Sequence, residues 1–202
     1  MGPTPQPSGY VPSEELGRLH VAVGFCNRCP ELVASRSRVV PGDGNPQAKI
    51  MFVGEGPGEQ EDKRGVPFVG PAGQLLNRCL GEIGLERKDV FITNIVKCRP
   101  PGNRVPKDEE VEQCREWLYA QLLLVNPAVV CPLGSPALKT LLGKDRSITR
   151  DHGRAFRLHG ITFFPIFHPA AALHQSDRME DLFGDFLALR AHLVSEGHLV
   201  AG

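Results

Sequence analysis

Four short apolar segments of the chain predict β-strands. Each is five to seven residues long and rich in β-branched or aromatic residues. The predicted strands are residues 49–53, 90–95, 128–133 and 161–167. Because these segments are apolar almost throughout, we expect both faces of the strands to be buried.

Longer segments between and after these strands carry apolar residues three and four positions apart, which is typical of amphipathic helices. The predicted helices are residues 13–24, 72–83, 107–124, 135–142 and 179–195. Strands that alternate with helices predict an α/β fold, a single domain in which a central, mostly parallel four-stranded sheet is flanked by helices. Ligands of such sheets bind at the carboxyl ends of the strands.

Composition narrows the picture without giving a function. The 202 residues include 22 glycines and 18 prolines, which predicts many loops. Residues 1–12 are rich in proline and poor in apolar residues, so we expect a disordered tail there and a folded domain over residues 13–202. The 23 basic and 23 acidic residues balance, so a nucleic-acid-binding surface would need locally segregated charge.

The chain has no sequence feature of secretion or membrane insertion. No basic start is followed by an apolar run, and no segment approaches the roughly 18 apolar residues of a membrane span. These features predict a cytoplasmic protein with no membrane partner. Its six cysteines would stay reduced there, so their spacing indicates metal binding or catalysis rather than disulfides.

Four of the six cysteines form two pairs along the chain. One pair has the spacing C-x2-C, and fifteen residues separate the members of the other: Cys26, Cys29, Cys98 and Cys114. Together they supply the four thiolates of a zinc site or of a [4Fe–4S] cluster, although buried cysteines without a metal are also common. Cys79 and Cys131 lie within a predicted helix and strand, so we interpret both as core residues.

An acidic glycine turn, GEGPGEQED at residues 54–62, follows the first predicted strand. It lacks the Lys-Ser/Thr pair of a phosphate-binding loop, and its carboxylates would repel a polyphosphate. The turn therefore favours a neutral, flat ligand, which the backbone of Gly54 and Gly56 can approach closely. Glu55 or Glu61 could orient a water molecule or accept a hydrogen bond from a ring N–H.

Three further side chains are candidates for the same site. Phe68 lies between glycines on a loop, where it is either a stacking platform or a core aromatic. Asn94 ends the second predicted strand, and its amide offers the donor and the acceptor that a pyrimidine edge requires, or else caps a turn. His168 follows the fourth strand, and a core histidine with satisfied hydrogen bonds is the alternative interpretation.

As a set, these motifs closely resemble the family 4 uracil-DNA glycosylases, the iron-sulfur branch of that superfamily. The resemblance extends from about Cys26 to Leu173 and rests on GEGPGEQED, on residues 65–73 with Pro67-Phe68-Val69-Gly70, on residues 93–101 with Thr93-Asn94-Ile95-Val96, and on His168-Pro169-Ala170-Ala171. It implies a three-layer α/β fold. It also implies that Cys26, Cys29, Cys98 and Cys114 bind a [4Fe–4S] cluster.

The resemblance further implies a monofunctional, monomeric enzyme, associated with the nucleoid, that flips uracil out of single- or double-stranded DNA and hydrolyses its glycosidic bond in base excision repair. Phe68 would stack on the base, Asn94 would read its O4 and N3–H edge, and His168 would donate to O2. The implied base-binding residues are Gly54, Glu55, Gly56, Phe68, Asn94 and His168, and the implied catalytic residues are Glu55, Glu61 and His168. Gly56 stands where other superfamily members carry a water-activating aspartate.

Local charge predicts where DNA would bind. Residues 139–159 carry six lysines and arginines, and residues 97–107 carry four basic residues and no acid, so both segments are expected to contact phosphates. Leu173 is the candidate for a side chain that enters the duplex, with burial as the alternative.

Three other functions are compatible with parts of the sequence. The first is a broader-specificity glycosylase of family 5, although that resemblance would require an apolar residue in place of Glu55. The second is an iron-sulfur electron carrier, which would need the cysteines but not Phe68, Asn94 and His168. The third is a zinc-stabilised DNA-binding module without catalysis.

Overall fold

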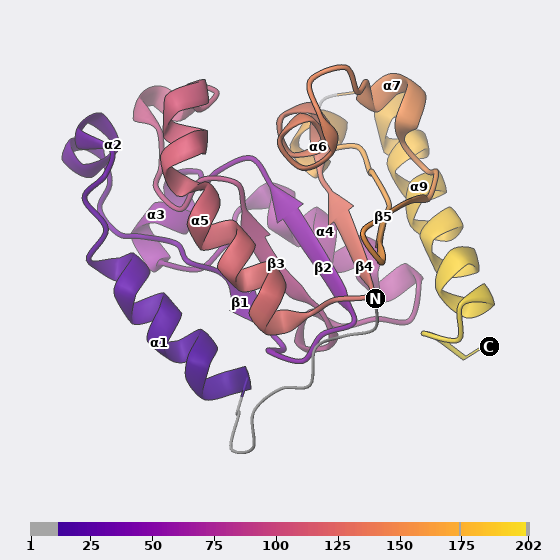
Figure 1. Ribbon diagram of the computed structural model, residues 1–202. Helices are drawn as coiled ribbons and strands as arrows, with labels where there is room; N and C mark the ends of the chain where they lie inside the picture. The colour runs from indigo at the N-terminus through magenta and orange to yellow at the C-terminus, as the bar shows by residue number, and fades with distance from the viewer. Residues whose placement is uncertain (1–11, 174, 201–202) are drawn as a thin grey trace.

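The computed structural model describes residues 12–173 and 175–200, and a mixed sheet lies at its centre (Figure 1). The strand order is β1-β3-β2-β4-β6-β5. The strands are β1 (Asp43–Gly44), β2 (Ile50–Gly54), β3 (Phe91–Asn94), β4 (Val129–Pro132), β5 (Phe156–Leu158) and β6 (Ile161–Phe163). The predicted tail, residues 1–12, lies outside the described residues apart from Pro12.

The predicted mostly parallel α/β sheet is confirmed, but the predicted number of strands was wrong. The four predicted strands are β2, β3, β4 and β6, and they pair in parallel. Two more strands pair antiparallel at the edges, β1 with β3 and β5 with β6. These edge strands are only two and three residues long, so they are too short to show an alternating pattern.

Nine α-helices and two 3-10 turns surround the sheet in the described part of the chain. They are α1 (Pro12–Gly24), α2 (Pro30–Ser35), α3 (Glu59–Arg64), α4 (Pro71–Glu82), η1 (Arg87–Asp89), η2 (Pro101–Asn103), α5 (Asp108–Val125), α6 (Gly134–Leu142), α7 (Ile148–Asp151), α8 (Pro169–Ala172) and α9 (Ser176–Ser195). All five predicted helices are present. Those that the sequence did not predict have at most six residues, less than two turns of apolar periodicity. None of the helices described is both long and apolar enough to cross a membrane.

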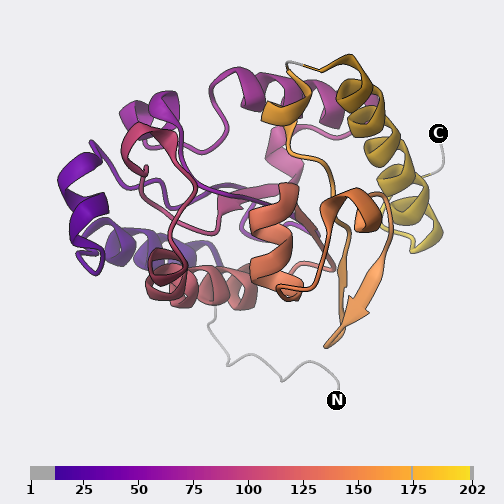
Figure 2. The same ribbon diagram turned by 90° about the horizontal axis from the view of Figure 1, so that it is seen from above.

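Two apolar cores lie on opposite faces of the sheet and make the three layers. Along β2, Ile50 and Phe52 belong to the core beneath α4 and α9, whereas Met51 and Val53 belong to the core beneath α1, α5 and α6. This alternation follows from the two-residue period of a strand. Figure 2 shows the two groups of helices on either side of the sheet. As predicted, Cys79 and Cys131 are fully buried.

The parallel pairing brings the predicted site residues to one edge of the sheet. Gly54 at the end of β2 lies directly opposite Asn94 at the end of β3. The segment after β6 runs on beside β4, where Leu133 and Ile166 form a bridge, and it leads to His168. The segments that follow β2, β3 and β6 therefore meet at the carboxyl edge, where this fold class binds its ligands.

Candidate active site

A cavity of about 200 Å³ opens at the carboxyl edge of the sheet. Six of the predicted catalytic or base-binding residues line it: Glu55, Gly56, Glu61, Phe68, Asn94 and His168. The other lining residues are Pro57, Gly58, Ala72, Pro100, Asn103, Arg104 and Ala170. Drug-sized ligands occupy cavities of roughly 300–1,000 Å³. This cavity therefore suits one small ring better than a whole nucleotide.

Gly54 is the one predicted base-binding residue that does not line this cavity, and it lies directly against two residues that do. A Cβ atom at Gly54 would lie 2.4 Å from Oδ1 of Asn94 and 2.6 Å from Cζ of Phe68. Only a residue without a side chain allows the ring and the amide to pack this closely against the strand end. Phe68 is buried in the core beneath α4 and also lines the cavity, so the two sequence interpretations of this residue are not exclusive.

The Asn94 side chain is 1% exposed, and its Oδ1 atom has no hydrogen-bond partner among the described residues. An unpartnered buried polar group costs about 1–3 kcal/mol. The backbone carbonyl of the same residue accepts a hydrogen bond of 2.7 Å from Lys97 Nζ, which fixes the strand end. Asn94 therefore lines the cavity with an amide whose oxygen is buried and unpaired.

His168 is held in one protonation state and one tautomer. Burial lowers its pKa to about 4, so the imidazole is neutral at pH 7. Its Nδ1 atom accepts a hydrogen bond of 3.1 Å from the backbone N–H of Ala170 in the first turn of α8. A neutral imidazole carries one proton, which must then be on Nε2. His168 is therefore a neutral hydrogen-bond donor beside the cavity, with its ring centroid 5.7 Å from that of Phe68.

The two glutamates of the cavity have different environments. Burial raises the pKa of the Glu55 carboxyl group. Glu61, in the first turn of α3, accepts hydrogen bonds through Oε1 from the backbone N–H groups of Val69 and Gly70, at 2.8 and 2.7 Å. One oxygen of Glu61 is thus committed to holding the loop that carries Phe68. No local pattern predicts this contact, because the loop and α3 meet only after folding.

The predicted phosphate contact by Lys97 was wrong. Lys97 is 1% exposed, and its Nζ donates to Thr93 Oγ1 and Gln121 Oε1, each at 2.6 Å, and to the Asn94 carbonyl. Burial lowers its pKa to about 8. Of the other basic residues in this segment, Arg104 lines the cavity and forms ion pairs with Glu31 and Glu110. The ammonium group of Lys97 therefore forms hydrogen bonds inside the protein, beneath Asn94, and does not face DNA.

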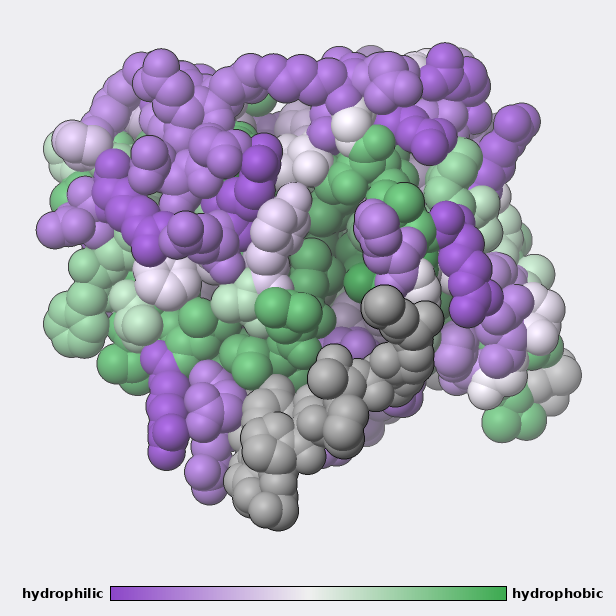
Figure 3. Space-filling view, viewed as in Figure 1, coloured by the Kyte–Doolittle hydropathy of each residue, from purple (hydrophilic) through white to green (hydrophobic). Residues whose placement is uncertain are grey.

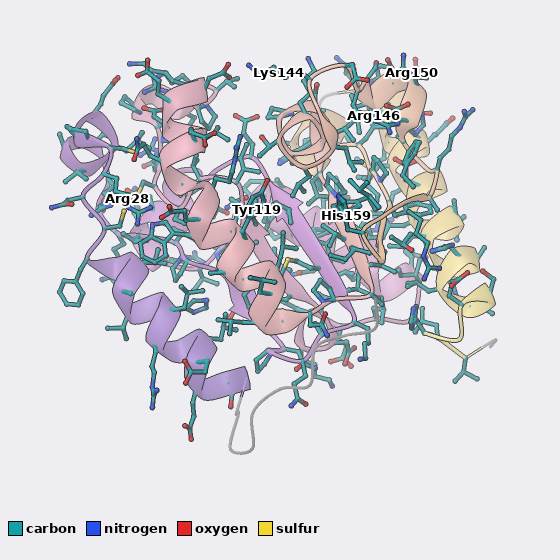
Figure 4. The ribbon with its side chains drawn as sticks, viewed as in Figure 1. Arg28, Tyr119, Lys144, Arg146, Arg150 and His159 are labelled. Carbon is teal, nitrogen blue, oxygen red and sulfur yellow. The ribbon has the colours of Figure 1, made fainter. Side chains whose placement is uncertain are left out.

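The other basic segment, residues 139–159, has several of its basic side chains near the carboxyl edge of the sheet. Figure 4 shows Lys144, Arg146 and Arg150 around α6 and α7, at the end toward which β2 and β4 run, whereas His159 lies further down. Part of this charge is paired or stacked, because Lys144 bonds Asp108 at 2.6 Å and the Arg146 guanidinium lies 4.6 Å from the centre of the Phe156 ring.

A groove of about 750 Å³ between α5 and α6 is larger than the candidate cavity. Figure 3 shows its apolar floor between hydrophilic margins. Its lining includes Lys139, Lys144 and Arg115 but none of the predicted base-binding residues. Size alone therefore does not locate the candidate active site.

The four paired cysteines line a second cavity, beside α1, α2 and α5. The Arg36 guanidinium donates to Cys98 Sγ at 3.0 Å, and the Trp117 indole N–H donates to Cys26 Sγ at 3.4 Å. Burial raises the pKa of the Cys98 thiol and raises that of Cys114 to about 11. These thiols would bind iron as thiolates, whose charge Arg36 and the N–H donors offset.

The donor set fits a [4Fe–4S] cluster, in which four cysteine thiolates each bind a different iron. Among the described residues, no group of three or more His, Cys, Asp or Glu side chains is arranged around the position of a single metal ion. The ligands would come from three segments: the connection between α1 and α2, the loop after β3, and α5.

Comparison with known proteins places this fold and site in a family. Residues 41–189 match the model of the uracil DNA glycosylase superfamily. The chain is 42% identical over 186 residues to a type-4 uracil-DNA glycosylase of Sulfurisphaera tokodaii, covering 88% of this chain and 84% of the relative. It is 49% identical over 166 residues to the type-4 enzyme of Thermotoga maritima, covering 81% and 86%. A type-5 uracil-DNA glycosylase of Pyrobaculum aerophilum is 32% identical, covering 77% and 87%. The chain therefore belongs to the uracil DNA glycosylase superfamily and, within it, to the type-4 family.

Proposed function

We propose that this protein is a monofunctional uracil-DNA glycosylase, which releases uracil from DNA and leaves an abasic site as the first step of base excision repair. The observation that carries the proposal is the shared cavity of Phe68, Asn94 and His168, with the buried, unpaired amide oxygen of Asn94. The alternatives are less favoured, because an electron carrier has no use for this cavity and identity to the type-4 relatives exceeds identity to the type-5 relative.

The target base would enter the cavity after rotation out of the DNA, which costs a few kcal/mol of unstacking. Uracil would then stack on Phe68 and place its O4 and N3–H edge against the Asn94 amide. The backbone of Gly56 would border the same site, with Gly54 behind Phe68 and Asn94. Because uracil is uncharged, the acidic turn that would repel a phosphate does not repel this ligand.

The chemistry would depend on the charge that develops as uracil departs. When the glycosidic bond breaks, its electron pair stays with the base and negative charge appears on O2. The neutral His168 ring would donate its Nε2 proton in a hydrogen bond to that oxygen, and such a donor commonly contributes about 3 kcal/mol. Glu55 would position the attacking water or stabilise the sugar cation, because Gly56 cannot act as a base. Glu61 would contribute mainly by holding the Phe68 loop, since Oε1 is already committed.

The direct test is release of uracil from oligonucleotides that contain one deoxyuridine, in single-stranded and in duplex form. We expect free uracil and an alkali-labile site in both, without strand cleavage at neutral pH. Absence of uracil release by the iron-loaded protein would refute the proposed function, whatever its affinity for DNA.

The Asn94→Asp variant is expected to weaken discrimination against cytosine. The amide donor that faces O4 of uracil becomes an acceptor, which matches the exocyclic amine of cytosine instead. Rates of release from matched uracil- and cytosine-containing oligonucleotides give the ratio. Unchanged rejection of cytosine would remove Asn94 from base reading.

We propose that Cys26, Cys29, Cys98 and Cys114 hold a [4Fe–4S] cluster. Bound there, the cluster would connect the N-terminal helices to the loop after β3 and to α5, which makes a structural role its first function. The Arg36 and Trp117 N–H groups would remain hydrogen-bonded to the sulfurs of Cys98 and Cys26.

Replacement of Cys114 with serine should remove this cluster. We expect loss of the absorbance at about 400 nm and of most bound iron, together with a lower melting temperature. Cys131→Ala is the matched control. Its thiol is buried in the core beneath α4 and α9, away from the four paired cysteines, so the iron content should stay unchanged. Full iron content in the Cys114 variant would contradict the ligand assignment.

The DNA partner would lie over the carboxyl edge of the sheet, near the basic residues of α6 and α7. Leu173, which is 37% exposed beside α8, would be the side chain that enters the duplex. We propose that the enzyme works as a monomer on single- or double-stranded DNA at the nucleoid in the cytoplasm.

A further inference from the structure

The residue proposed to stack on uracil has a strained backbone. Phe68 has a φ of +52°, in the left-handed region that residues with a side chain rarely adopt. It lies in the loop between α3 and α4, which has no regular hydrogen-bonding pattern of its own. A conformation of this kind persists only where surrounding groups hold it.

The loop is held from two sides. On one side, Glu61 accepts from the N–H groups of Val69 and Gly70. On the other side, α4 packs so closely that a Cβ atom at Gly73 would lie 1.9 Å from the Phe68 carbonyl oxygen. Glu61 thus fixes the two N–H groups that follow Phe68. The carbonyl groups of Pro67 and Phe68 are held by another partner.

That partner is Arg87, nineteen residues further along in η1. Its Nη1 donates to the Phe68 carbonyl at 3.0 Å, and its Nη2 donates to the Pro67 carbonyl. Its Nε donates to Asp43 Oδ2 at 2.9 Å, so the guanidinium group is itself held against β1. The side chain is 23% exposed, and Arg87 does not line the cavity.

We infer that Arg87 is a positioning residue for base recognition, acting through the backbone of Pro67 and Phe68. Its planar, forked guanidinium can bind two successive carbonyl groups and the Asp43 carboxylate at once, which fixes the peptide plane on the amino side of the aromatic ring. Lysine offers a single charged nitrogen and cannot reproduce this geometry. The inference rests on the proposed function for its effect on catalysis, but its structural part does not.

A purely structural role for Arg87 makes a different prediction. If Arg87 only connected η1 to β1, its loss would lower stability and slow uracil release equally with or without the Phe68 ring. If it positions the ring, its effect on uracil release disappears once the ring is absent. A double-mutant cycle between Arg87 and Phe68 separates the two roles.

The experiment compares wild type, Arg87→Met, Phe68→Ala and the double variant as iron-loaded proteins, well below their melting temperatures. We expect Arg87→Met to lower kcat/KM for uracil release about tenfold in the wild-type background and less than twofold in the Phe68→Ala background. We expect Arg87→Lys to lower kcat/KM about as much as Arg87→Met does. It should destabilise the fold less, because it keeps the positive charge beside Asp43. Lys88→Met, which removes a neighbouring charge in the same turn, should leave kcat/KM unchanged.

Hydrogen exchange supplies a readout that does not depend on activity. In Arg87→Met and Arg87→Lys, we expect faster amide exchange in the peptide over residues 65–74 than in the Lys88→Met control. Unchanged exchange there, or equal losses of kcat/KM in the two Phe68 backgrounds, would overturn the inference. Faster exchange in a protein whose wild type releases no uracil would refute the proposed function and leave the loop-holding role of Arg87 standing.

Discussion

Replacing His168 with alanine is expected to slow uracil release by about two to three orders of magnitude, with little change in affinity for uracil-containing DNA. The reason is that the Nε2 proton faces charge that develops only as the glycosidic bond breaks, so its loss raises the barrier more than it weakens substrate binding. Single-turnover rates at saturating enzyme, with binding measured separately, distinguish the two effects. His159→Ala is a control that removes an exposed histidine on the turn between β5 and β6.

The pH dependence follows from the neutral state of His168. Its pKa is about 4 in the folded protein and near the ordinary value of 6.5 in the unfolded chain. Between these values the unfolded chain binds the proton first, so the contribution of His168 to stability is complete above pH 6.5 and is lost as the pH falls through about 4. The melting temperature of His168→Ala should therefore fall less than that of wild type over this range.

Catalysis should follow the same protonation state. The His168-dependent part of the rate is expected to persist from pH 7 to about pH 5, because the ring stays neutral there. A ratio of wild-type to His168→Ala rates that collapsed near pH 6.5 would mean that the ring titrates normally, which would contradict the burial that the structure assigns to it. A ratio near one at every pH would remove His168 from the reaction.

Much of this site could be predicted from the sequence because its parts follow directly from regular strands. Asn94 and the acidic glycine turn are located by the ends of two apolar segments, and parallel pairing then brings them together without further information. His168 was located in the same way, by the fourth segment, although that strand is shorter than predicted. β6 ends at Phe163, and Pro165, which has no N–H to donate, separates it from the isolated bridge of Ile166 with Leu133.

The remaining features depend on contacts between distant segments, which no local pattern reveals. Lys97 looked like a surface charge because lysine usually is one, yet Thr93, Asn94 and Gln121 give its ammonium group three acceptors inside the protein. Arg87 carried no signal at all, since its partners are backbone carbonyl groups of another loop. A side chain that binds the backbone of a distant segment produces no characteristic residue spacing in the sequence.

Replacing Gly54 with alanine is expected to lower kcat/KM for uracil release about a hundredfold, with a loss of only about 1–3 kcal/mol in stability. The backbone at Gly54 is extended and paired within β2, so a methyl group there causes no conformational strain of its own. The whole effect comes from its contacts, 2.4 Å from Asn94 Oδ1 and 2.6 Å from the Phe68 ring. The added methyl group must displace the two groups that are proposed to hold the base.

Two comparisons identify the cause of this loss. Gly81→Ala, on the exposed side of α4 with no atom within 4 Å of the new Cβ, should keep full activity and gain about 0.5–1 kcal/mol in stability. Combining Gly54→Ala with Phe68→Leu relieves the contact with the ring but not the one with Asn94 Oδ1, so stability should recover only in part. Uracil release should not recover, because the stacking ring is gone. Full activity in Gly54→Ala would mean that the ring and the amide need not meet at the strand end, and the base would then have to bind elsewhere.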